Sequence, residues 1–103
     1  MKLEILSDRQ IENPNEEDIV TAVTRVYAEK VDAVILLSDE KNNRFMQVPC
    51  GGEHIEYCVG PQGPIYAVEG ISLDQAIRLF VAYARGEDSW KTEVPWEIFM
   101  DRI

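Results

Sequence analysis

The sequence is poor in the residues that build metal centres, disulfide frameworks and nucleic-acid surfaces. Its 103 residues include one histidine and two cysteines, and ten Lys or Arg stand against 19 Asp or Glu, which gives a net charge of −9. Two cysteines do not make a disulfide framework in a chain of this size, and we expect both thiols to be reduced. Because nucleic acids and anionic lipids attract cationic proteins, we expect this acidic chain to bind neither.

Long apolar runs are also absent. No run approaches the roughly 20 apolar residues that a membrane-spanning helix needs. Glu4 and Asp8 interrupt the N-terminal segment, so it lacks the apolar centre of a signal peptide. We therefore expect a cytoplasmic protein that does not enter a membrane. The length and the 46% hydrophobic content predict one globular domain over residues 1–103, with a core of its own.

Two segments show the periodicity of amphipathic helices. In the first, Asn13 is the expected N-cap, Pro14 the first helical residue and Glu16 the partner in a capping box, and the helix is expected to end near residue 29 or 30. In the second, Ser72 begins an S-x-x-Q capping box and Gly86 is placed to end the helix. The predicted buried stripes are Ile19, Ala22, Val23, Val26 and Tyr27 in the first helix, and Leu73, Ala76, Ile77, Phe80, Val81 and Ala84 in the second.

Four strand-like segments lie between the helices, at residues 31–38, 44–48, 53–59 and 64–68, and residues 2–6 could add a short strand. The turns between them are short, with Gly51-Gly52 as one candidate, and strands joined in this way are antiparallel. The predicted fold class is α+β: an antiparallel four- to five-stranded sheet with two helices packed on one face. The predicted order is (β)αββββα, followed by a C-terminal tail.

The one cluster that suggests metal or thiol chemistry is Cys50, His54 and Cys58. On a strand, residues four apart lie about 13 Å from each other, which is too far for ligands of one ion. A zinc site also needs three or four protein ligands. We therefore expect no metal, no cofactor and no catalytic residues, with a small enzyme that uses Cys50 or His54 as an alternative.

A partner-binding surface is the favoured functional interpretation. Strand 53–59 alternates, so Ile55 and Tyr57 face one way and His54 and Glu56 the other, toward a sheet face that the helices leave open. Carboxylates there would suit a partner with basic side chains. The candidate partner-binding residues are Gln47, His54, Glu56, Tyr66, Glu87, Asp88 and Trp90. For Trp90 and Trp96, packing in the core is favoured over a role at an interface.

Five segments carry a resemblance to a known family. They are Ile11-x-Asn13-Pro14, residues 46–52, Glu56-Tyr57, residues 72–90 and Trp96-Glu97. In these segments the sequence resembles the type-one immunity family of bacterial polymorphic toxin systems, which is often encoded beside deaminase toxins. The resemblance implies a non-enzymatic inhibitor that occludes the active site of a cognate toxin domain, such as a deaminase or nuclease. It carries over no catalytic residue. Without the resemblance, the residues fit equally a small acidic regulatory or scaffold domain that has no toxin partner.

Overall fold

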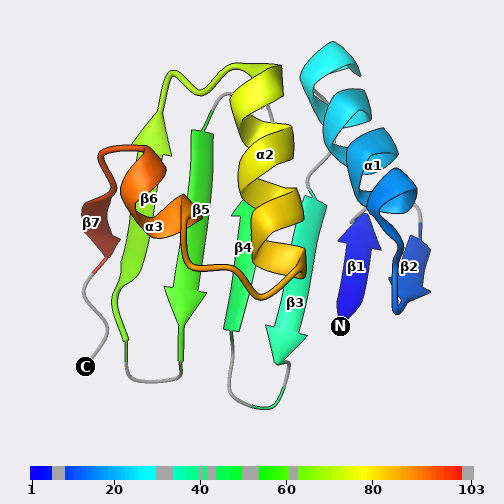
Figure 1. The fold of residues 1–103 in the computed structure, drawn as a ribbon, viewed down its shortest axis with the longest axis horizontal. Coiled ribbons are helices and arrows are strands. Elements are labelled where there is room, and N and C mark those ends of the chain that lie inside the picture. Colours follow the sequence, from blue (N-terminus) through cyan, green and yellow to red (C-terminus); the bar gives the residue numbers. More distant parts are fainter. Residues whose placement is uncertain are drawn as a thin grey trace.

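The computed structural model describes residues 1–5, 9–29, 34–39, 41, 44–49, 54–60 and 63–100. Within them, seven strands form one antiparallel sheet in the order β2-β1-β3-β4-β5-β6-β7, and the helices lie in front of it (Figure 1). The elements are β1 Lys2–Ile5, β2 Arg9–Glu12, α1 Glu16–Glu29, β3 Val34–Asp39, β4 Arg44–Val48, β5 His54–Val59, β6 Ile65–Glu69, α2 Leu73–Ala84, α3 Trp90–Glu93 and β7 Glu97–Met100. The α+β class is confirmed, but the predicted four to five strands were too few.

The strands that the sequence did not predict are at the two ends of the sheet. β2 has the sequence RQIE, with one apolar residue, and β7 lies in the segment that was predicted as a tail. Each is defined by its neighbour: Ile11 pairs with Leu3 of β1, and Glu97 pairs with Ala67 of β6. Four residues are too few for a periodicity, so these strands depend on pairing with distant parts of the chain.

The core lies between the sheet and helices α1 and α2, which cover the same face (Figure 1). Opposite residues in an antiparallel pair share a face, so Leu3, Leu36 and Met46 form one buried row across three strands. We call the other side of the sheet, away from α1 and α2, the outer face. Ile19, Ala22, Val23 and Val26 of the predicted α1 stripe are buried, and Tyr27 is half-buried. In α2, Leu79 is fully buried although the predicted stripe left it out.

The start of α1 differs from the prediction. The side chain of Asn15 accepts a hydrogen bond from the Asp18 N–H at 2.8 Å, and the Asp18 carboxylate accepts one from the Asn15 N–H at 3.0 Å. The capping residue is therefore Asn15 rather than Asn13, and Pro14 precedes the helix. Asn13 has a φ of 50° and donates its N–H to the carbonyl of Met1 at 2.8 Å, which holds it in the turn after β2.

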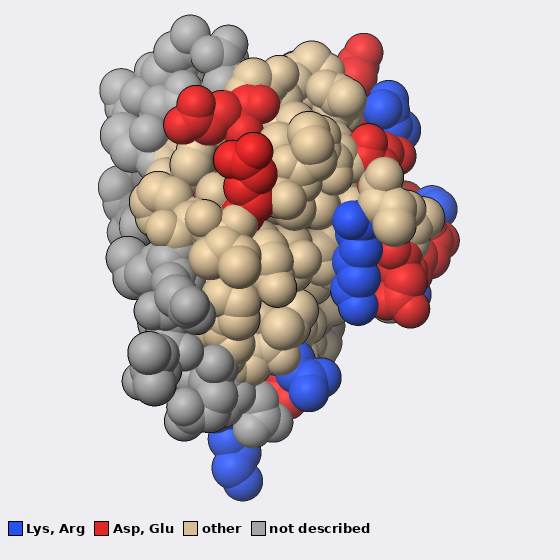
Figure 2. Space-filling model, turned by 90° about the vertical axis from the view of Figure 1, so that its left-hand side faces the viewer, with Lys and Arg blue, Asp and Glu red and all other residues tan. Residues whose placement is uncertain are grey.

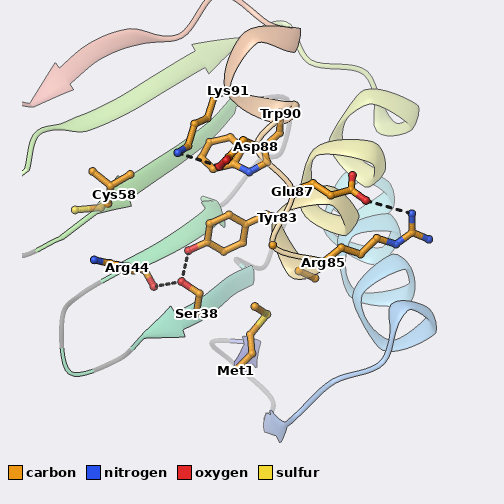
Figure 3. Close-up of a pocket in the computed structure, with 13 residues that line it drawn as sticks. Met1, Ser38, Arg44, Cys58, Tyr83, Arg85, Glu87, Asp88, Trp90 and Lys91 are labelled. Carbon is orange, nitrogen blue, oxygen red and sulfur yellow. Dashed lines mark hydrogen bonds and ion pairs between the residues drawn. The ribbon is translucent and has the colours of Figure 1, made fainter.

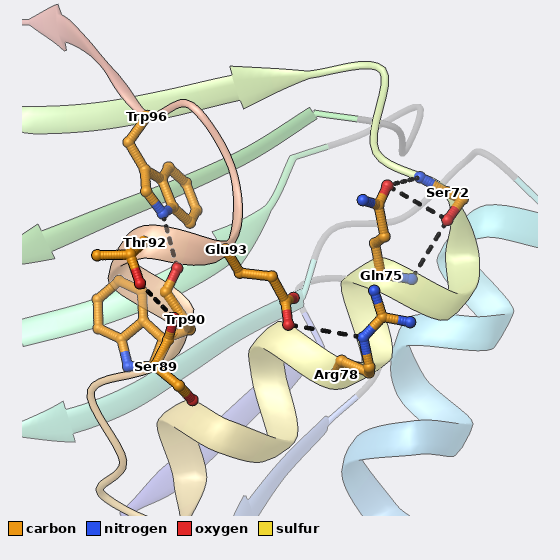
Figure 4. A network of polar contacts seen from close by, with 8 residues as sticks. All are labelled: Ser72, Gln75, Arg78, Ser89, Trp90, Thr92, Glu93 and Trp96. Atoms are coloured by element: carbon orange, nitrogen blue, oxygen red, sulfur yellow. Dashed lines mark hydrogen bonds and ion pairs between the residues drawn. The ribbon is translucent and has the colours of Figure 1, made fainter.

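Both ends of α2 agree with the sequence. The Ser72 hydroxyl accepts a hydrogen bond from the Gln75 N–H at 3.2 Å, and the Gln75 side chain accepts one from the Ser72 N–H at 3.4 Å (Figure 4). At the other end, Gly86 has a φ of 76° and donates to the carbonyl of Tyr83 at 3.1 Å. None of the helices in the described residues is long and apolar enough to cross a membrane.

The left-handed conformation of Gly86 leads to a stability prediction. A Cβ added there would meet no atom within 4 Å, so the cost of Gly86→Ala is conformational alone. We expect the variant to lose about 1–2 kcal/mol of unfolding free energy, measured by urea denaturation. Gly60→Ala is the matched control, because its Cβ also has open space and its φ lies outside the left-handed region. An equal loss in both variants would contradict this explanation.

Candidate functional site

Two hollows in the described surface contain candidate functional residues. The larger, about 550 Å³, lies at the C-terminal end of α2, and we call it the α2 pocket. It is lined by Met1, Ser38, Arg44, Cys58, Val59, Tyr83, Ala84, Arg85, Gly86, Glu87, Asp88, Trp90 and Lys91. The smaller, about 370 Å³, lies beside β7, and we call it the β7 hollow. It is lined by His54, Ala67, Val68, Glu69, Pro95, Glu97, Ile98 and Phe99.

A hydroxyl pair lies on one wall of the α2 pocket (Figure 3). Tyr83 reaches from α2 to within 2.6 Å of the Ser38 hydroxyl, and Ser38 donates to the carbonyl of Arg44 at 3.3 Å. Because the Ser38 hydrogen is used in this way, the Tyr83 hydroxyl is the donor between the two. Burial raises the pKa of Tyr83 above its ordinary value.

The charges around the α2 pocket are largely paired. Lys91 lies 3.2 Å from Asp88, and Arg85 lies 3.9 Å from Glu87 and 2.9 Å from Glu16 of α1. Glu87 and Asp88 were both predicted to bind a partner, and the structure places them here with cations beside them (Figure 3). Their negative charge is thus already compensated in part, which makes this rim a weaker attractant for a basic partner.

Trp90 belongs to an aromatic cluster behind the α2 pocket. Only 4% of its surface is exposed, and its ring meets Tyr57 edge-on at 4.7 Å and Tyr83 at 5.5 Å between centroids. Trp96 donates its indole N–H to the carbonyl of Trp90 at 3.0 Å (Figure 4). Tyr66 stacks on Tyr57 at 4.9 Å, so it points to the helix-covered side and not to the outer face. The predicted placement of Tyr66 on the open face was therefore wrong.

The raised pKa of Tyr83 predicts a loss of stability in alkali. Folding favours the neutral phenol of Tyr83. Its contribution to the free energy of unfolding is therefore fully present below the ordinary pKa, near pH 10, and is lost as the pH rises through the raised pKa. We expect Tyr83→Phe to lose less stability than wild type between pH 8 and pH 11, measured by urea denaturation at each pH. Burial and the nearby Tyr66 also raise the pKa of Tyr57, so part of the dependence persists. Equal losses in both proteins would contradict the prediction.

The outer face holds the other predicted residues, and here the structure brings them together. Gln47 of β4 and Glu56 of β5 are opposite in register, and the Gln47 amide donates to the Glu56 carboxylate at 2.7 Å. The second carboxylate oxygen lies 2.8 Å from Nε2 of His54. Glu56 is only 8% exposed, so the carboxylate predicted to face a partner is instead held inside by two hydrogen-bonding side chains.

His54 connects this buried group to residues that the sequence did not identify. Its Nδ1 lies 3.8 Å from the carboxylate of Glu69, and its ring meets Phe99 edge-on at 5.7 Å. Glu97 stands on the same face, because it pairs with Ala67, which in turn pairs with Glu56. In the sequence, Glu97 stood out only through the pair Trp96-Glu97, and that pair did not indicate that β6 would be its neighbour.

The β7 hollow has an exposed apolar side. Phe99 is 55% exposed on the outer face, where its ring meets His54. Ile98 is 60% exposed on the other face of β7, because it pairs with Tyr66. No lysine or arginine of the described part of the chain lines the hollow. In Figure 2, which looks onto the β7 side, a group of carboxylates stands among uncharged side chains without a cation between them, whereas acids and bases alternate over the helical layer at the right.

The cluster of Cys50, His54 and Cys58 is only partly described. Cys50 and the predicted Gly51-Gly52 turn lie outside the described residues. Cys58 is buried beside Phe45 and Ile65, and its thiol donates to the carbonyl of Gly60 at 3.1 Å. No group of three or more His, Cys, Asp or Glu side chains in the described part of the chain could hold a metal ion.

Among the residues that the structure describes, the β7 hollow thus combines carboxylates that have no cation beside them, exposed apolar side chains and a polar group fixed below them. Such a combination can bind another macromolecule without performing chemistry on it. Comparison with known proteins adds no relative: no family model, no curated protein and no solved structure matched this chain.

Proposed function

We propose that this chain is an inhibitor of the immunity type, which binds a cognate bacterial toxin domain and occludes its active site. The inhibitor itself carries out no reaction. The toxin domain would be a deaminase or nuclease, whose substrate-binding cleft is basic because it must hold nucleotide phosphates. The carboxylates of the inhibitor would occupy the places of those phosphates.

The overall charge supports the proposal. A net charge of −9 on 103 residues produces a field that accelerates association with a basic protein. The resemblance of the sequence to the type-one immunity family points in the same direction and supplies the class of partner.

The observation that carries the proposal is the composition of the β7 hollow. Glu69 and Glu97 are exposed there, no lysine or arginine among the described residues lines the hollow, and Phe99 is exposed beside them. Protein interfaces typically combine an apolar centre, often aromatic, with a polar rim. By contrast, the rim of the α2 pocket already pairs its acids with its bases.

The test is to produce the chain together with the product of the neighbouring gene, which we expect to contain the toxin domain. We expect cells to survive the toxin, and we expect the two proteins to elute as one complex in gel filtration. The association rate should fall as salt concentration rises, since salt screens the attraction. A catalytically inactive toxin variant does not harm the producing cells. The complex can therefore be made even if the chain does not protect them.

Persistent toxicity together with separate elution would show that the proposal is wrong, and the acidic regulatory or scaffold alternative would then stand. An association rate that does not respond to salt would remove only the electrostatic part of the proposal. A control with the chain boiled before mixing would distinguish specific binding from adhesion of an acidic polypeptide to a basic one.

A further inference from the structure

We propose that the β7 hollow is a subsite for one arginine side chain of the partner. The identity of that partner depends on the function proposed above, but the chemistry of the subsite does not. The subsite consists of Glu69 and Glu97 as anionic acceptors and the ring of Phe99, with walls formed by His54, Ala67 and Pro95.

His54 connects the hollow to the buried Glu56. A carboxylate accepts hydrogen bonds, so at 2.8 Å from Glu56 the Nε2 atom of His54 carries a hydrogen. Its Nδ1 atom lies 3.8 Å from a carboxylate oxygen of Glu69. The His54 ring is thus held by Glu56 and forms a wall of the hollow beside Glu69.

Two glutamates give the hollow its negative charge. The side chain of Glu69 is 86% exposed, and its only ion contact in the described residues is the one to His54. Glu97 has no ion pair in that part of the chain and is also exposed. Because Glu97 pairs with Ala67, two residues before Glu69 on β6, the two glutamates are diagonal neighbours on one face. Their backbones are thus about 7–8 Å apart, close enough for both carboxylates to reach one cation.

The geometry of the hollow favours arginine over lysine. A guanidinium is planar and offers donors along two edges, so it can serve the acceptors of Glu69 and Glu97 together, whereas an ammonium group acts as a point charge. Its flat face can lie on an aromatic ring, and Phe99 supplies one at the hollow. The apolar walls suit the methylene stem of the same side chain.

The experiment uses the peptide acetyl-Gly-Arg-Gly-amide, titrated into the ¹⁵N-labelled protein and followed by NMR. We expect shifts at the amides of residues around the hollow, and at least a fivefold weaker affinity in Glu69→Gln and in Glu97→Gln. Glu12→Gln is the matched control, since it removes the same charge from exposed strand β2 at the opposite end of the sheet. An equal loss in Glu12→Gln would mean diffuse attraction and would overturn the subsite.

Two further probes test the choice of cation. The same peptide with citrulline, the neutral isostere of arginine, should not bind, and the lysine peptide should bind at least threefold more weakly than the arginine peptide. Binding of citrulline equal to that of arginine would overturn the subsite, and so would a lysine peptide that binds as tightly.

The outcomes also separate the subsite from the proposed function. If the toxin complex forms but Glu69→Gln and Glu97→Gln leave its affinity unchanged, the subsite is wrong and the inhibitor function stands. If no toxin complex forms but the arginine peptide binds at the β7 hollow as described, the subsite stands and the toxin is the wrong partner.

Discussion

Replacing Trp90 with alanine is expected to lower the free energy of unfolding by about 3–5 kcal/mol, the usual cost of removing a large buried aromatic side chain. The indole is almost fully buried and contacts the rings of Tyr57, Tyr83 and Trp96. For a domain of about 100 residues, each kcal/mol corresponds to about 4–8 °C in melting temperature. Urea denaturation followed by circular dichroism measures the loss directly.

Phe99→Ala is the matched control for Trp90→Ala. It also removes an aromatic ring from the C-terminal segment, but Phe99 is more than half exposed and its only ring contact in the described residues is with His54. We expect it to cost less than about 1 kcal/mol, as surface substitutions usually do. If both variants lost the same free energy, Trp90 would not be the packing anchor that its contacts indicate.

The same Phe99→Ala variant is expected to weaken partner binding strongly, although its effect on stability is small. If the β7 hollow is the contact surface, an exposed aromatic ring at its side acts as a hot spot, and its removal should weaken the toxin complex by about 2 kcal/mol or more, roughly 30-fold. The dissociation constant of the complex can be measured by calorimetry or by biolayer interferometry. Most of the change should appear as faster dissociation.

Val59→Ala is the control for that effect. Val59 is also an exposed apolar residue, but it lines the α2 pocket rather than the β7 hollow. We expect its complex with the toxin to keep the wild-type affinity. Weakening by Val59→Ala with no effect of Phe99→Ala would move the contact surface to the α2 pocket and would contradict the placement at β7.

The parts of the fold that the sequence predicted well are those set by residues close in the chain. The capping box of Ser72 and Gln75 and the left-handed turn at Gly86 each need only a few neighbouring residues, and both are present as expected. The cap of α1 shows where this approach fails. Asn13 and Asn15 are both suitable caps, and the hydrogen bond of Asn13 to Met1 decides between them.

The candidate site was predicted only in part, for a related reason. Gln47, His54 and Glu56 were chosen from the alternation of strands and do lie together. Glu69 and Phe99 were not chosen, because nothing near them in the chain indicates that β5, β6 and β7 bring them to one hollow. The exposure of Glu56 was predicted wrongly. Alternation predicts which face a residue is on, but not whether side chains such as Gln47 and His54 cover it there.

The amino-acid sequence by itself therefore determined the α+β class, the apolar stripe of α1, the ends of α2 and the acidic character of the surface. Each of these follows from composition or from hydrogen bonds and periodicity within a few residues. Only the tertiary structure decided that two further strands complete the sheet, that Trp90 lies in the core, and that Glu69 and Glu97 line one hollow with Phe99, without a lysine or arginine from the described residues. These features depend on which distant strands pair, because pairing sets both the neighbours of a side chain and the solvent that reaches it.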